Sequence, residues 1–339
     1  MKTKLLKILS VGIICLFSIV MVSCQGKKDE NNKLAFISFN EENKKNTRTE
    51  LVYNGLTSYE NINFTYDNVN TSQEYINKLQ KLKKDKYNLI VSNGFLTNNE
   101  TATVAEQNKD SNFVVIDSVI DPVLDNVTSI LFNTHESSFL AGYLAGLKTE
   151  TNKIGYIGFE RGLISDRYEF GFKAGVLTAA KEKDVEISIF TKLIDSFDSY
   201  DDGKLIANEI YEKGADIIFQ TVGVTGLGVI DSAKSHNKFV IGYDLDQSYL
   251  APDNMLTSVI KKYDTVGSMV IKKYNEGSLE FGKKLYFGLK EDATGLTTFD
   301  KEKSLYSEDI NKKVMEMSEK IKSGKVKVPY NEKVYTDFK

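Results

Sequence analysis

Residues 213–219 read Lys-Gly-Ala-Asp-Ile-Ile-Phe and lead to Gly223, and residues 85–91 read Asp-Lys-Tyr-Asn-Leu-Ile-Val and lead to Gly94. Each stretch has the pattern of a helix end, a short buried strand and a glycine loop that opens on the next helix. Because the same unit occurs twice, far apart in the chain, we expect two lobes of similar construction.

Short β-branched runs alternate with longer amphipathic stretches from Lys33 onward. In 72–84, for example, the apolar residues recur at the three-to-four spacing of a helix with one buried face. Such alternation predicts parallel sheets covered by helices on both faces, here an α/β fold of two doubly wound lobes. Ligands of these sheets bind beyond the carboxyl ends of the strands, so two facing lobes form a cleft that can close on a small solute.

The N-terminus has the pattern of a secretory signal, with Lys2, Lys4 and Lys7 before a short apolar run over 8–22. The run ends in Met-Val-Ser-Cys at 21–24, which resembles a bacterial lipobox. We therefore predict a signal peptide over 1–23, lipidation of Cys24, and a polar tether over 24–32. The protein would then lie in the cell envelope, anchored by lipid on the outer side of the membrane. An uncleaved anchor helix is the alternative.

Charge and motif content exclude several function classes. The net charge is −3 and the basic residues are scattered, which argues against a nucleic-acid surface. The only histidines, His135 and His236, form no cluster with metal-ligand spacing, and no nucleophile elbow occurs. We expect neither an enzyme nor a bound metal or cofactor, and we interpret His135 as a surface or capping residue.

A glycine-rich turn over 222–228 lacks the lysine of a phosphate-binding loop. It is interpreted as a tight turn that feeds a helix N-terminus, where Thr225 and Gly226 could still present backbone N–H groups to a ligand.

The polar run Asp244-Leu245-Asp246-Gln247 follows a predicted buried strand. Since alternate residues of a strand point the same way, Asp244 and Asp246 could both face the cleft and accept hydrogen bonds from ligand hydroxyl groups. Lys261, in the next predicted strand, could complete this polar grip. An ordinary solvated turn, with aspartate as a helix cap, explains the same residues equally well.

Several stretches together resemble the basic membrane protein family, the purine-nucleoside-binding lipoproteins that serve ABC-type importers. These stretches are 135–146, 153–158, 170–175, 214–220 with 225–228, 241–247, and 256–258 leading to Lys261. The resemblance implies a type I periplasmic-binding fold and a nucleoside held between the lobes, its base stacked on aromatic rings. It also implies that Asp244 and Lys261 bind the ribose hydroxyls, that Asp117 is a cleft carboxylate of the first lobe, and that Phe219 is a candidate stacking ring. Phe219 could equally be plain core.

The sequence departs from the family near the start of the first helix. Members usually carry Asp-Asp-x-Ser-Phe-Asn there to bind the base, whereas this chain has Lys-Lys-Asn-Thr-Arg-Thr at 44–49. Arg48 could stack on a base, or the loop could serve a different, acidic ligand.

We therefore expect a first lobe over 33–133 plus about 256–280, and a second over 134–255 plus about 281–339. The expected function is capture of a nucleoside, with purines favoured, by a monomer that delivers it to an ABC-type permease. Two alternatives remain: the same role with another small polar solute such as a sugar, or a surface lipoprotein that adheres to or senses host molecules.

Overall fold

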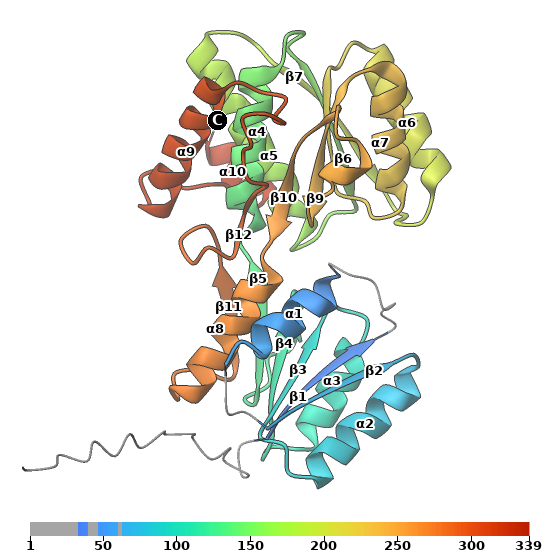
Figure 1. The fold of residues 1–339 in the computed structure, drawn as a ribbon, viewed down its shortest axis with the longest axis vertical. Helices are drawn as coiled ribbons and strands as arrows, with labels where there is room; N and C mark the ends of the chain where they lie inside the picture. Colours follow the sequence, from blue (N-terminus) through green and yellow to red (C-terminus); the bar gives the residue numbers. More distant parts are fainter. Residues whose placement is uncertain (1–32, 40–46, 60–62, 339) are drawn as a thin grey trace, which may run out of the picture.

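The structure is a computed structural model that describes residues 33–39, 47–59 and 63–338. The expected signal peptide, Cys24 and the tether lie outside the described residues, as do residues 44–46. In the described ranges the chain forms two α/β lobes stacked along the long axis of the molecule (Figure 1), each built on a six-stranded sheet.

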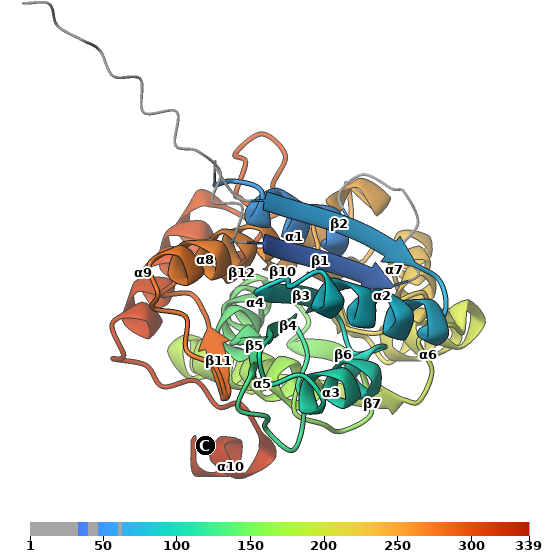
Figure 2. The same cartoon turned by 90° about the horizontal axis from the view of Figure 1, so that it is seen from below.

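The sheet of the first lobe is parallel throughout. Its strands are β1 Lys33–Phe39, β2 Asn63–Val69, β3 Leu89–Asn93, β4 Asn112–Ile116, β5 Val127–Phe132 and β11 Lys283–Phe287, in the order β11-β5-β4-β3-β1-β2. Its helices are α1 Arg48–Leu56, α2 Ser72–Lys84, α3 Asn98–Glu106 and α8 Tyr263–Asn275. Helices α1 and α8 pack side by side against one face of the sheet, and α2 and α3 cover the other (Figures 1 and 2).

The second lobe repeats this plan, although its last strand is antiparallel to its neighbour. Its strands are β6 Lys153–Phe159, β7 Ser188–Ile194, β8 Ile217–Gln220, β9 Phe239–Asp244, β10 Met255–Lys261 and β12 Thr294–Leu296, in the order β12-β10-β9-β8-β6-β7. Its helices are α4 Thr134–Lys148, α5 Ser165–Lys183, α6 Tyr200–Glu212, α7 Thr225–His236, α9 Glu308–Lys322 and α10 Glu332–Phe338, with a short 3-10 turn, η1, at Ser248–Leu250. Helices α4, α5 and α9 share one apolar core, and α6 and α7 pack on the other face.

The two sheets correspond strand by strand, which confirms the repeat seen in the sequence. Strand β3 leads to Gly94 with φ +79°, and its counterpart β8 leads to Gly223 with φ +56°. Glycine adopts these left-handed conformations without the steric cost that a Cβ imposes, so the same turn opens on a helix in both lobes. Each sheet therefore presents its carboxyl-end loops in the same way.

Three crossovers connect the lobes, between β5 and α4, between β10 and α8, and between β11 and β12. Helix α8 packs against α1 in the first lobe. Two segments belong to the other lobe than the one we expected from the sequence. Segment 256–261 was expected in the first lobe but forms β10, which pairs with β9 in the second, and 284–289 was expected in the second lobe but overlaps β11, which pairs with β5 in the first. Each strand pairs with a parallel neighbour, β9 or β5, and the residue pattern does not show which of the two sheets a strand joins.

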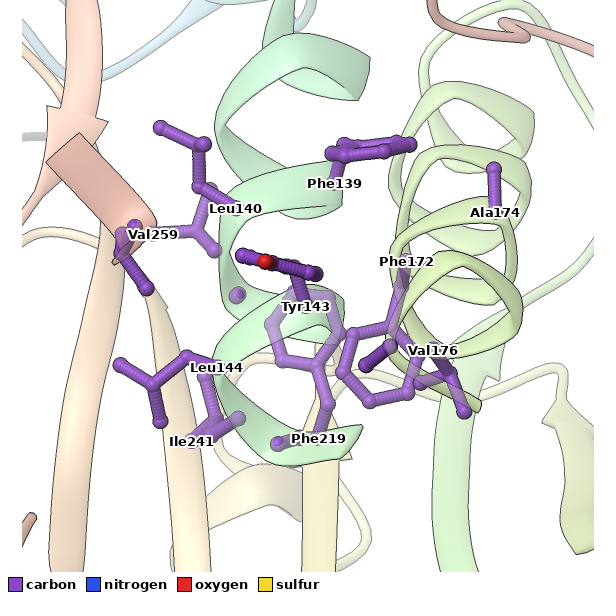
Figure 3. Packing of buried hydrophobic residues seen from close by; sticks show 14 of the residues in the cluster. Phe139, Leu140, Tyr143, Leu144, Phe172, Ala174, Val176, Phe219, Ile241 and Val259 are labelled. Carbon is purple, nitrogen blue, oxygen red and sulfur yellow. The ribbon is translucent and has the colours of Figure 1, made fainter. Parts of the chain in front are cut away.

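Close helix contact in the second lobe depends on small residues. A Cβ on Gly175 of α5 would lie 2.0 Å from the Phe139 carbonyl oxygen of α4, so only glycine allows the two helices to approach this closely. The apolar cluster around this contact includes Tyr143, Phe172 and Phe219 (Figure 3). This rigid packing fixes the start of α5, which lies beside the site described next.

Candidate functional site

Charged side chains from both lobes meet where the strands end. Asp117 follows β4 in the first lobe, while Asp244 and Lys261 end β9 and β10 in the second. Lys261 Nζ lies 2.9 Å and 2.7 Å from the two carboxylate oxygens of Asp117, and 3.3 Å from Asp244 Oδ1. The three side chains are only 5 to 11% exposed, so the cluster is buried between the lobes.

Arg48 and Tyr263 complete this cluster from the first lobe. Arg48 is the first residue of α1, and its Nε donates a hydrogen bond to Asp244 Oδ2. The Tyr263 hydroxyl lies 2.8 Å from Asp117 Oδ2 and 2.9 Å from Asp244 Oδ1. Because a phenol has one proton, it donates to one of these carboxylates at a time.

The charges of the cluster balance, with two cations and two anions, which lets them tolerate burial. Burial opposes ionisation of Asp244, but the neighbouring Arg48 and Lys261 outweigh it and lower the pKa of Asp244 to about 2. Burial also opposes the charge on Lys261, yet Asp117, Tyr168 and Asp244 raise the pKa of Lys261 above its ordinary value. At neutral pH, Asp244 is thus a hydrogen-bond acceptor only and Lys261 a donor only.

Both aspartates have a backbone conformation that is rare outside glycine. Asp117 has φ +60° and Asp244 has φ +73°, and the two residues lie at the ends of equivalent strands, β4 and β9. Non-glycine residues held in this region cost free energy and concentrate at functional sites. Each lobe therefore places one aspartate with a strained backbone at its side of the interlobe site.

Aromatic rings extend the site across the second lobe. The Tyr168 ring centroid lies 5.7 Å from Lys261 Nζ and 5.8 Å from the Tyr243 ring. The Tyr243 hydroxyl accepts a hydrogen bond from the Gly223 N–H at 2.8 Å. Phe197 packs against Gly223, and its ring stacks on Phe159 at 4.2 Å between centroids.

The model of the family described as ABC transporter substrate-binding protein PnrA-like matches residues 38–332, which is most of the chain. The chain belongs to this family. Basic membrane protein D of Borreliella burgdorferi strain JD1 is 34% identical over 339 aligned residues, covering 96% of each chain. The CD4+ T-cell-stimulating antigen of Listeria monocytogenes is 34% identical over 76% of this chain and 74% of its own.

Solved structures show the same fold. A solute-binding protein of an ABC transporter system from Aeropyrum pernix K1 superposes with a TM-score of 0.71 at 21% identity, over 90% of this chain and 96% of its own. A transcriptional activator of the comK gene from Bacillus halodurans gives a TM-score of 0.72 at 22% identity, over 88% of this chain and 100% of its own. The predicted type I periplasmic-binding fold is thus confirmed.

Membership of the PnrA-like family makes the chain a substrate-binding protein of an ABC transporter, with a small-molecule ligand and a permease as partner. Among the described residues, no group of three or more histidine, cysteine or acidic side chains is arranged to hold a metal ion. Within the same ranges, no helix has the length and apolar character needed to cross a bilayer.

Four of the residues singled out in the sequence come together in the structure: Asp117, Asp244, Lys261 and Arg48. The prediction that Asp246 shares the orientation of Asp244 is wrong. The Asp246 side chain is exposed and accepts a hydrogen bond from the Ser248 N–H at the start of η1. The left-handed conformation of Asp244 ends the strand, so the alternation of side chains stops there.

Thr225 and Gly226 organise the second lobe internally. The Thr225 side chain bonds to the Ser199 N–H and the Ser196 carbonyl oxygen. The backbone N–H groups of Thr225 and Gly226 donate to carbonyl oxygens of the same lobe. The expectation that this turn offers free N–H groups to a ligand is therefore wrong.

Phe219 is plain core. Its ring is fully buried and packs against the rings of Tyr156, Tyr168 and Phe172, which leaves no face for a ligand (Figure 3). Sequence reasoning instead missed Phe197, which is 38% exposed and follows β7. A single aromatic residue within the polar segment 195–199 was the signal that could have identified it.

His135 is buried and does not cap α4, whose N-cap is Asn133, so its interpretation as a surface or capping residue is wrong. Its ring contacts Tyr330, and its Nδ1 lies 3.0 Å from Arg167 Nη1. Arg167 also donates to Asn133 Oδ1 at 3.2 Å, so this group of residues lies next to the first crossover.

Proposed function

We propose that this chain binds a nucleoside, with purine nucleosides the first candidates, between its lobes and delivers it to an ABC-type permease. The observation that carries the proposal is the buried cluster of Asp117, Lys261 and Asp244, which joins the carboxyl ends of both sheets. Ligands of doubly wound sheets bind at this place.

The chemistry of the cluster suits a sugar with neighbouring hydroxyl groups. An ionised carboxylate accepts two hydrogen bonds side by side, and a lysine ammonium donates to a hydroxyl oxygen. Asp244 stays ionised at neutral pH, and Lys261 stays charged. A ribose with its two vicinal hydroxyls matches this pattern of acceptors and donor.

The exposed face of Phe197 supports an aromatic base in the ligand. The ring is held by its stack on Phe159 and by its contact with Gly223, so it is pre-organised as a platform. Stacking of a base on an aromatic side chain contributes about 1–3 kcal/mol.

Arg48 favours a second candidate, an anionic or otherwise different polar solute. Its side chain is 44% exposed at the edge of the cluster and adds a positive charge there. The Nε of Arg48 bonds to the Asp244 carboxylate, which offsets much of the positive charge that Arg48 adds. The nucleoside therefore remains the first proposal.

A binding panel separates these candidates. Thermal unfolding is measured with adenosine, guanosine, inosine and uridine, with adenosine monophosphate, and with ribose and glucose. We expect the midpoint to rise with one or more nucleosides, since a ligand that binds only the folded state stabilises it. A shift with adenosine monophosphate alone would favour an anionic ligand, and a shift with only the free sugars would replace the nucleoside by a sugar.

We also propose that the protein is a monomer anchored outside the cytoplasmic membrane by lipid on Cys24. The sequence at 21–24 supports this anchor, and residues 25–32 have no apolar side chain to bury. Metabolic labelling with palmitate tests it: label is expected on the wild-type protein and absent from Cys24→Ser. Label that persists in Cys24→Ser would contradict the anchor.

A further inference from the structure

The hydroxyl of Tyr168 is buried without a hydrogen-bond partner. Tyr168 lies in the first turn of α5 and is 3% exposed, and its Oη makes no hydrogen bond to the described part of the chain. Burying a polar group without a partner costs free energy, so each such group in a folded protein calls for an explanation.

Other buried tyrosines of the same lobe are satisfied. The Tyr211 hydroxyl donates to the Phe239 carbonyl oxygen at 2.8 Å, and the Tyr156 hydroxyl lies 3.3 Å from Thr221 Oγ1. The lack of a partner is therefore particular to Tyr168 among these three residues. It does not reflect a general looseness of the core, because the Tyr168 ring itself is packed against Phe219 and Tyr243.

The position of Tyr168 relates its hydroxyl to the interlobe site. The ring centroid lies 5.7 Å from Lys261 Nζ, the same atom that bonds to Asp117 of the first lobe. Burial raises the pKa of Tyr168, and the nearby Asp244 and Asp117 raise it further against the opposing effect of Lys261. The hydroxyl therefore keeps its proton at neutral pH and is an uncommitted donor within electrostatic reach of the cluster.

We propose that the Tyr168 hydroxyl hydrogen-bonds to an oxygen of the ligand's sugar and thereby selects ligands that carry an oxygen at that position. The sugar is favoured over the base because the Tyr168 ring adjoins Lys261, which pairs with Asp244, whereas Phe197 lies beyond Tyr243 and Gly223. This inference rests on the proposed function and adds a specificity-determining residue to it.

The substitution Tyr168→Phe removes only the hydroxyl, and Tyr211→Phe is the matched control because its hydroxyl is satisfied and lies outside the cluster. Two quantities are measured for each variant: the unfolding midpoint of the ligand-free protein, and the affinity for adenosine, guanosine and inosine. For Tyr168→Phe we expect an unchanged or higher midpoint together with an affinity about tenfold weaker. For Tyr211→Phe we expect the reverse, a lower midpoint and an unchanged affinity.

Nucleosides that lack one hydroxyl identify the contact. The affinities of 2′-, 3′- and 5′-deoxyadenosine are compared between the wild type and Tyr168→Phe. If Tyr168 bonds to one hydroxyl, the analogue without that hydroxyl binds both proteins equally, while the other two lose affinity in the variant. Equal affinity of Tyr168→Phe and the wild type for every nucleoside would overturn the inference.

Failure of the proposed function gives a different result. If the wild type binds no nucleoside, the proposed ligand is wrong. The unfolding midpoints of the ligand-free variants then test the role of the Tyr168 hydroxyl. If the midpoint of Tyr168→Phe falls as much as that of Tyr211→Phe, the Tyr168 hydroxyl stabilises the fold, and the inference is overturned. A midpoint that stays equal or rises would support a hydroxyl kept for a ligand.

Discussion

Lys261 and Asp117 belong to different lobes, yet Lys261 Nζ lies within 2.9 Å of both carboxylate oxygens of Asp117. Asp244 and Arg48 make the converse pair, with the anion in the second lobe and the cation in the first. Each lobe therefore contributes one cation and one anion, and each charge is paired with its opposite across the interface. These pairs attract the two lobes to one another when each cation lies opposite the anion of the other lobe.

The substitution Lys261→Met should destabilise the protein strongly. It keeps the length of the side chain but leaves Asp117 and Asp244 buried near each other without their shared cation. Removing one partner of a buried pair costs about 3–5 kcal/mol. Urea unfolding measures the change, with Lys283→Met as control because its pair with Glu280 is exposed to solvent and should contribute far less. Equal effects of the two substitutions would contradict the structural account of the cluster.

The substitution Arg48→Ala should open the ligand-free protein. Half of the Arg48 side chain faces solvent, so screening keeps its effect on the free energy of unfolding below about 1 kcal/mol. The lost bridge to Asp244 lies between the lobes, however, and we expect a larger radius of gyration by small-angle X-ray scattering. Lys78→Ala is the control, since Lys78 pairs with Asp67 within the first lobe. An unchanged radius would show that Arg48 does not hold the lobes together.

The residues of this cluster illustrate what sequence could and could not predict. Strand–helix alternation and the repeated unit predicted both sheets, because those patterns are local. Asp244 and Lys261 were identified because carboxyl-end positions of such sheets face the ligand, and Asp117 was identified only through the family resemblance. Their pairing across the interface depends on two segments separated by more than a lobe, and no local pattern encodes it.

Other features depended on tertiary context that the sequence does not display. The lobe of β10 and β11 is decided by which neighbouring strand each one pairs with, β9 or β5, and the residue pattern does not show that partner. Phe219 and Phe197 are both aromatic residues near strand ends, and only the packing around them separates a core ring from an exposed one. The alternation of side chains that predicted the orientation of Asp246 ends at Asp244, whose backbone is left-handed.

Acid stability should depend on His135. Arginine only donates hydrogen bonds, so the contact with Arg167 requires His135 Nδ1 to accept and the ring to be neutral. Burial, and then Arg167, lower the pKa of His135 from 6.5 to about 3. Between these values the unfolded ring binds a proton that the folded ring does not, so stability is complete above pH 6.5 and falls towards pH 3, by about 5 kcal/mol in all.

His135→Asn keeps an acceptor near Nδ1 and removes the titration. Free energies of unfolding measured in urea at pH 7, 6, 5 and 4 should fall less steeply for this variant, by up to about 1.4 kcal/mol per pH unit. Parallel pH profiles for the variant and the wild type would contradict a neutral buried His135.

The substitution Phe197→Ala should weaken nucleoside binding more than it weakens the fold. The exposed face of the ring is the proposed platform for a base, and its loss should cost about 1–3 kcal/mol of binding free energy. Titration calorimetry measures the affinity. Leu205→Ala is the control, since Leu205 is an exposed apolar residue of α6 in the same lobe. If the two variants bind alike, Phe197 does not stack on the ligand.

Calorimetric titration of adenosine, guanosine and inosine into the wild type and into Asp244→Asn tests the central claim most directly. Asparagine keeps the size of the side chain but loses the charge and one acceptor. The account predicts saturable binding of one nucleoside per wild-type molecule and at least about tenfold weaker binding to the variant. Absence of binding to the wild type, or equal affinity of the two proteins, would contradict a nucleoside held by the interlobe cluster.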